Sequence, residues 1–80
     1  MALNNDLLRT FIVIAECGNL TQAASRLNRT QSAVSVQLRK LEEALRVTLF
    51  ERGARGMRLS PAGEQLLPAA RRTLAEFERT

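Results

Sequence analysis

The sequence predicts a mainly α-helical fold: a three-helix core, a short β-hairpin and a long last helix. Apolar residues recur at helical spacing in four segments, and only a short turn separates the second segment from the third. A stretch with two glycines, RGARG, then lies between two short apolar runs, as a hairpin loop does. Two helices joined by a short turn and followed by a hairpin predict a winged helix-turn-helix.

The first two helices are predicted from their apolar stripes and from the residues at their ends. We expect the first over residues 6–17, with Asn5 as its N-cap, Gly18 at its end, and a buried stripe of Leu7, Leu8, Phe11, Ile14 and Ala15. We expect the second over residues 20–27, with Asn19 as its N-cap. Residues 28–30 then form the turn to the third helix.

The third helix is expected over residues 31–45, after Thr30 as its N-cap. Its buried stripe comprises Val34, Leu38, Leu41 and Leu45. At 100° per residue, the outward face begins with Ser32, Ser35 and Val36 and becomes basic only at Arg39 and Lys40. A surface helix normally carries charged residues along its whole outward face, whereas the first turns of this one present small, neutral side chains.

The hairpin is predicted from Leu49 and Phe50 as one strand and residues 57–59 as its return. The fourth helix is expected over residues 60–78, because Ser60 is a good cap and Pro61 suits the first helical position. Pro68 inside it should kink the helix.

The fourth helix carries an apolar stripe that reaches beyond what a domain of this size should bury. The notable positions are Leu74 and Phe77, which we expect to extend past the core and to pack on a second copy of the helix. The predicted homodimer interface is Leu66, Leu67, Ala70, Leu74 and Phe77. The alternative is that these residues fold back or pack on another domain.

The composition and the charge distribution favour some functions for this protein and exclude others. The net charge is +4, and no Asp or Glu lies between Glu16 and Glu42 or from Arg52 to Gly63. Clustered positive charge suits a polyanion, nucleic acid before a membrane, although a solvated basic surface is the simpler alternative. The chain has one cysteine and no histidine, which excludes an internal disulfide and an ordinary zinc site, so we expect no metal, no cofactor and no enzyme activity. No signal peptide or membrane-spanning run is visible, which favours a cytoplasmic protein.

The outward face of the third helix suits the major groove of DNA. Gln and Ser side chains bind base edges, an exposed valine contacts a thymine methyl, and later basic residues reach phosphates. Arg55, at the hairpin tip, is expected in a flanking minor groove. Each residue also has an ordinary explanation, since Ser and Gln are common in first turns and Arg55 suits a solvated loop. The remaining alternative is a helical module whose face binds an acidic protein partner.

The segments AASRLN, TQSAVSVQLRKLEE and LFERGARGMRLSPAGE, in that order, resemble the N-terminal DNA-binding domain of LysR-type transcriptional regulators. The resemblance covers nearly the whole chain from about Leu7 onward. It implies a winged helix-turn-helix over residues 1–59, a dimerising linker helix over residues 60–80, and generally a tetramer at full length. It also implies a bacterial regulator whose C-terminal domain binds a small inducer, and we expect that domain to be absent from these 80 residues.

The resemblance further implies specific DNA contacts. Base contacts would be made by Gln31, Ser32, Ala33, Ser35, Val36 and Arg55, and backbone contacts by Thr21, Thr30, Arg39 and Arg52. Val36 is a departure, because this family often has Arg or Gln at that position. A polar base contact is therefore replaced here by an apolar one, and the target sequence cannot be borrowed from relatives.

Overall fold

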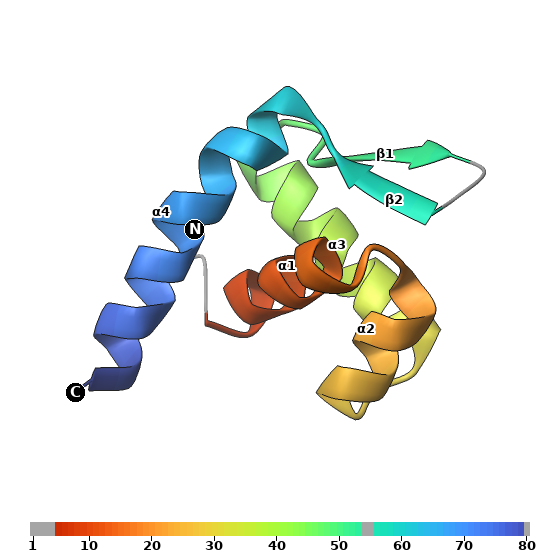
Figure 1. The fold of residues 1–80 in the computed structure, drawn as a ribbon, viewed down its shortest axis with the longest axis horizontal. Helices are drawn as coiled ribbons and strands as arrows, with labels where there is room; N and C mark the ends of the chain where they lie inside the picture. Colours follow the sequence, from red (N-terminus) through yellow and green to blue (C-terminus); the bar gives the residue numbers. More distant parts are fainter. Residues whose placement is uncertain (1–4, 54–55, 80) are drawn as a thin grey trace.

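The computed structural model describes residues 5–53 and 56–79, and it has the predicted mainly helical fold (Figure 1). Helices α1 (Asn5–Cys17), α2 (Leu20–Leu27) and α3 (Gln31–Leu45) precede the strands β1 (Phe50–Gly53) and β2 (Gly56–Leu59), and α4 (Pro61–Arg79) follows. The helix α1 lies at the centre and packs against α2, α3 and α4. The predicted winged helix-turn-helix with a long last helix is thus confirmed.

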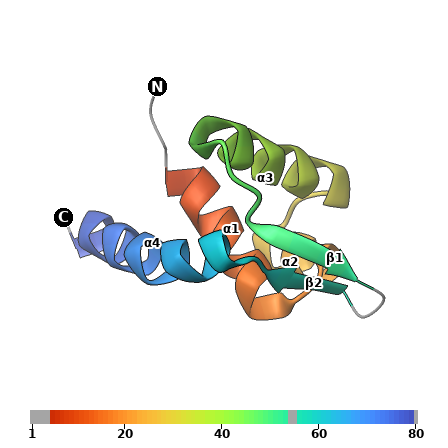
Figure 2. The ribbon, with the colours of Figure 1, turned by 90° about the horizontal axis from the view of Figure 1, so that it is seen from above.

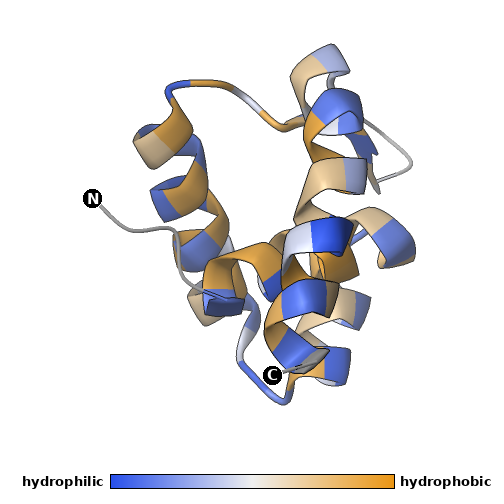
Figure 3. Ribbon diagram, turned by 90° about the vertical axis from the view of Figure 1, so that its left-hand side faces the viewer, coloured by the Kyte–Doolittle hydropathy of each residue, from blue (hydrophilic) through white to orange (hydrophobic). Residues whose placement is uncertain are grey.

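A single core joins the helices and the hairpin. Its fully buried large side chains include Phe11 and Ile14 from α1, Leu41 from α3, and Leu49 before β1. The rings of Phe11 and Phe50 lie 5.6 Å apart and are tilted by 60°, which fastens β1 to α1. Figure 3 shows the hydrophobic positions of α3 on the side that faces the rest of the domain.

Side-chain caps fix the starts of three helices. Asn19 Oδ1 accepts a hydrogen bond from the Gln22 amide at 2.8 Å, Thr30 Oγ1 from Ala33 at 3.0 Å, and Ser60 Oγ from Gly63 at 3.0 Å. All three caps were predicted from the sequence. The cap expected at Asn5 is wrong, because α1 already includes that residue.

The hairpin differs from the prediction in where its first strand lies. Leu49 precedes β1 and is fully buried, and β1 continues through the charged residues to Gly53, which pairs with Gly56. The Met57 amide donates to the Gly18 carbonyl at 2.9 Å, so β2 is attached to the turn between α1 and α2. A Cβ on Gly56 would lie 2.5 Å from that same carbonyl oxygen, which explains the glycine there.

The helix α4 shares the core instead of leaving it. Ala70 and Leu74 are only 2% and 9% exposed, so the expectation that Leu74 extends past the core is wrong. The helix lies against α1 along enough of its length to bury both residues, and Arg9 on α1 pairs with Glu78 at 2.6 Å. Phe77, by contrast, is 62% exposed, as expected.

The described helices give no sign of a membrane segment. Within residues 5–53 and 56–79, none combines the length and the apolar character needed to cross a bilayer.

Candidate nucleic-acid interface

The helix α3 presents a small, uncharged surface at its start. Burial of Val34, Leu38 and Leu41 against the core fixes the rotation of the helix, so Gln31 and Ser32 face outward and are exposed. Ala33 and Ser35 are half-buried beside them, and Val36 is 44% exposed. These are the base-contact residues predicted on the helix, and the structure brings them together on one outward surface.

The first turn of α2 adjoins the first turn of α3. The Thr21 hydroxyl lies 3.5 Å from Gln31 Oε1, close enough for a long hydrogen bond, and both side chains are exposed. The predicted backbone contact Thr21 and the predicted base contact Gln31 are therefore immediate neighbours.

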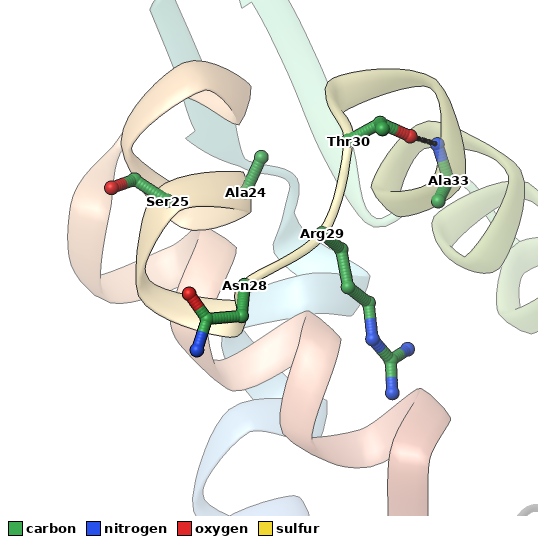
Figure 4. A pocket seen from close by; sticks show the side chains of 6 residues that line it. All are labelled: Ala24, Ser25, Asn28, Arg29, Thr30 and Ala33. Carbon is green, nitrogen blue, oxygen red and sulfur yellow. Dashed lines mark hydrogen bonds between the residues drawn. The ribbon is translucent and has the colours of Figure 1, made fainter.

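An open hollow lies at the turn between α2 and α3 (Figure 4). Its volume is about 550 Å³, and its lining residues are Ala24, Ser25, Asn28, Arg29, Thr30 and Ala33. Asn28 closes α2 in the left-handed conformation, with φ 56°. Figure 4 shows the Arg29 side chain pointing away from Thr30 and Ala33 toward α1. The Arg29 guanidinium therefore does not cover the start of α3.

Acidic residues of α1 form ion pairs with two of the arginines that lie between Glu16 and Glu42 in the sequence. Arg29 pairs with Asp6 at 3.0 Å, and Arg26 pairs with Glu16 at 2.9 Å. Hydrogen bonds to Glu16 and to the Cys17 thiol raise the pKa of the Arg26 guanidinium above its ordinary value, so it stays charged. Because of these ion pairs, the net positive charge around the turn is lower than the sequence between Glu16 and Glu42 suggests.

The basic residues farther along α3 are different. Arg39 and Lys40 are exposed and form no ion pair with any residue in the described part of the chain. They follow the neutral surface along the same helix, about one turn after Val36. Uncompensated charge therefore begins where the helix face ceases to be small and neutral.

The hairpin extends on the same side of the molecule as the start of α3. Figures 1 and 2 show the end of β1, the start of β2 and the start of α3 on the side of the molecule away from α4. Arg52 on β1 is exposed, whereas Arg58 lies 3.9 Å from Glu51 on the paired strand. Arg55, the predicted base contact of the hairpin, lies outside the described residues.

Two contacts that orient α3 were not predicted from the sequence. The buried Thr10 hydroxyl on α1 donates to Gln37 Oε1 at 2.7 Å. The Glu42 side chain accepts a hydrogen bond from the Leu49 amide at 2.8 Å. Thr10 and Gln37 lie on different helices, 27 positions apart, and no local pattern marks Thr10 or Glu42 as a bonding residue. These bonds fasten α3 to α1 and to the segment that precedes β1.

Comparison with known proteins decides the family. Residues 5–64 match the family of bacterial regulatory helix-turn-helix proteins called lysR. The chain belongs to the LysR family. It is a helix-turn-helix DNA-binding domain of a regulator of this kind, and this membership agrees with the prediction that the chain is not an enzyme.

Relatives of the LysR domain cover nearly all of this chain. It is 47% identical over 77 residues to the regulator DgdR of Burkholderia cepacia, which covers 96% of this chain and 26% of DgdR. It is 51% identical over 73 residues to the regulator TfdS of Cupriavidus pinatubonensis, covering 91% of this chain and 24% of TfdS. The chain thus spans about a quarter of the length of these relatives.

A solved DNA-binding domain agrees with the fold over nearly its whole length. The structure of the CbnR DNA-binding domain in complex with DNA superposes with a TM-score of 0.92 at 40% identity. The superposition covers 96% of this chain and 88% of that one. The architecture described above is therefore that of a LysR DNA-binding domain.

Proposed function

We propose that this chain recognises a specific double-stranded DNA sequence as a homodimer. The first turns of α3 enter the major groove, and the hairpin lies at an adjacent minor groove. The observation that carries the proposal is the order of surfaces along α3. An exposed face of small, uncharged side chains comes first. Arg39 and Lys40 follow, and neither forms an ion pair within residues 5–53 and 56–79.

Major-groove chemistry explains that order. Base edges lie at the floor of the groove and are approached closely by short side chains, whereas long cations are suited to the phosphates at its rim. Asp or Glu at the start of α3 would repel phosphate, and the helix has no acidic residue in its first turn. Its free N–H groups further favour anions at that end.

The roles we assign follow from position on this surface. Gln31, Ser32, Ala33, Ser35 and Val36 face the bases, and Thr21, Thr30, Arg39 and Arg52 face the DNA backbone. Arg55 is assigned to the minor groove on the sequence argument alone. The solved complex of the related CbnR domain with DNA supports a DNA-facing role for the fold.

The dimer proposal rests on an outward stripe of α4. Ala62, Leu66, Ala69, Thr73 and Phe77 recur at spacings of four and three residues, which is one helix face. Leu66 is half-buried and Phe77 is exposed, and small residues between them permit a close approach of two helices. Of the five residues predicted at the interface, Leu66, Leu67 and Phe77 retain exposed surface, whereas Ala70 and Leu74 support the helix from the core.

A two-fold dimer has consequences for its target and for the longer protein. Its half-sites would lie about one DNA turn, or a multiple of it, apart. On the family resemblance, we further propose a cytoplasmic regulator that assembles into tetramers and carries its inducer-binding domain outside these residues.

Selection of bound fragments from random-sequence duplex DNA tests the proposal. The expected result is a single enriched motif with two related halves, which competes against random duplex better than a scrambled version does. Binding without any enriched motif, or no binding at low salt, would contradict sequence-specific recognition. Capture of acidic proteins with no DNA binding would favour the protein-interaction alternative.

A further inference from the structure

The contribution of Val36 to the stability of the fold does not explain why a valine occupies this position. Among the described residues, the exposed large hydrophobic side chains are Val36, Val47 and Phe77, and Val36 is the one that lies on α3. A β-branched residue on an exposed helix face buries little surface and has a lower helix propensity than Ala, Gln or Lys. Its presence there is better explained by a contact made outside the chain.

The surroundings of Val36 leave its methyl groups accessible. Its neighbours one turn toward the helix start are Ser32 and Ala33, both small, and its neighbours one turn later are Arg39 and Lys40. Gln37, the next residue, is held by Thr10 and is half-buried. An apolar group approaching between the neutral surface and the cations therefore meets Val36 first.

Resting on the proposed function, we infer that Val36 binds the C5-methyl group of a pyrimidine in each half-site. In the major groove, thymine differs from uracil only by this methyl group, and 5-methylcytosine carries it where cytosine does not. Arg39 and Lys40 then hold the backbone beside the base that Val36 contacts. The ligand class is thus a C5-methylated pyrimidine, and base identity at that position is read partly through one apolar contact.

Removing single methyl groups from the DNA should weaken binding at one position of each half-site. In the duplex selected by the wild-type chain, each thymine is replaced in turn by deoxyuridine, symmetrically in both half-sites. Burial of a methyl group accounts for about a three- to fourfold change in affinity per half-site, so one position should show about a tenfold loss. At that position, a cytosine–guanine pair should bind more weakly still, and 5-methylcytosine should recover the same factor relative to cytosine.

Protein variants assign the effect to Val36. Val36→Ala should bind the thymine and deoxyuridine duplexes almost equally, and Val36→Thr, which keeps the shape and the β-branch, should retain part of the difference. Val47→Ala is the matched control, because it removes the same atoms from an exposed valine in the loop after α3. It should keep the full preference for thymine. Circular dichroism checks that each variant is folded.

The outcomes separate this inference from the proposed function. If no motif is enriched, both are wrong. If a motif is enriched and no thymine-to-deoxyuridine change weakens wild-type binding, only the inference is wrong. If Val36→Ala stays as sensitive to the methyl group as the wild type, another residue reads that group, and the inference is again overturned.

Discussion

Arg29 and Arg39 show how the same side chain serves two purposes within one helix-turn-helix. Arg29 lies in the turn, and its guanidinium is held by Asp6 of α1. Arg39 lies on the exposed face of α3 and pairs with no carboxylate in the described residues. We interpret the first as a structural cation that fastens the turn to α1, and the second as a cation available to phosphate.

Releasing Arg29 should strengthen DNA binding without changing sequence preference. Asp6→Asn removes one negative charge and frees a guanidinium near the start of α3, so affinity should rise a few-fold for specific and random duplexes alike at low salt. Glu76→Gln on α4 is the matched control, with the same charge change on an exposed helix position away from the turn. Fluorescence anisotropy measures both. Equal effects of the two variants would mean that net charge alone, and not the position of Arg29, controls affinity.

Substitution of Gln31 and of Arg39 by alanine should affect DNA binding differently. Gln31→Ala removes a base contact and should cost about 1–3 kcal/mol on the selected duplex but little on random duplex. Arg39→Ala removes a phosphate contact and should weaken all duplexes alike, with a shallower dependence on salt. Competition assays at several salt concentrations distinguish the two. The opposite pattern would reverse the assigned roles.

At the scale of elements, the hairpin is positioned by the turn between α1 and α2. The hydrogen bond from Met57 to the Gly18 carbonyl and the close approach of Gly56 to the same oxygen hold β2 against that turn. The position of the proposed minor-groove contact thus depends on a backbone contact between residues far apart in sequence.

Two glycines of the hairpin allow a controlled test of this contact. Gly56 has φ 115°, and its added Cβ would lie 2.5 Å from the Gly18 oxygen, whereas at Gly53 the nearest atom would be 4.0 Å away. Gly56→Ala should therefore lower the free energy of unfolding by about 1–3 kcal/mol and weaken DNA binding. Gly53→Ala should change the stability much less. Thermal unfolding of both variants checks this, and similar melting temperatures would contradict the role given to Gly56.

The elements differ in how well the sequence predicts them. Asn19, Thr30 and Ser60 cap their helices through residues three positions away, so the local pattern was sufficient to find them. The pairing of Arg29 with Asp6, the attachment of β2 at Gly18 and the burial of Leu74 depend on how distant segments pack. No spacing in the sequence contains that information. For the site, the helical period placed the face of α3 correctly, but it did not show which arginines are neutralised.

At the scale of the whole molecule, α4 has a buried face and a more exposed face. Ala70 and Leu74 pack on α1 and complete the core, while Leu66 and Phe77 lie on the neighbouring outward stripe. In the proposed dimer we therefore expect association to depend most on Phe77 and folding on Ala70 and Leu74, and substitutions should separate the two.

Charge introduced on each face of α4 should have a different result. Phe77→Asp should give a monomer by sedimentation. That monomer should stay folded, because the substituted side chain lies outside the core. Leu74→Asp buries a carboxylate in the core and should cost about 3 kcal/mol or more, a large fraction of the stability of so small a domain, so its melting temperature should fall strongly. A dimer that survives Phe77→Asp unchanged would count against the outward stripe of α4 as the interface.

In the proposed complex, base contacts on α3 select a sequence while cations supply affinity for any duplex. The most direct test is a salt titration of binding to the selected duplex and to a scrambled duplex of equal length. We predict that both affinities fall steeply as salt rises, and that the selected duplex stays at least about a thousandfold stronger throughout. Equal affinities for the two duplexes at every salt concentration would contradict the claim.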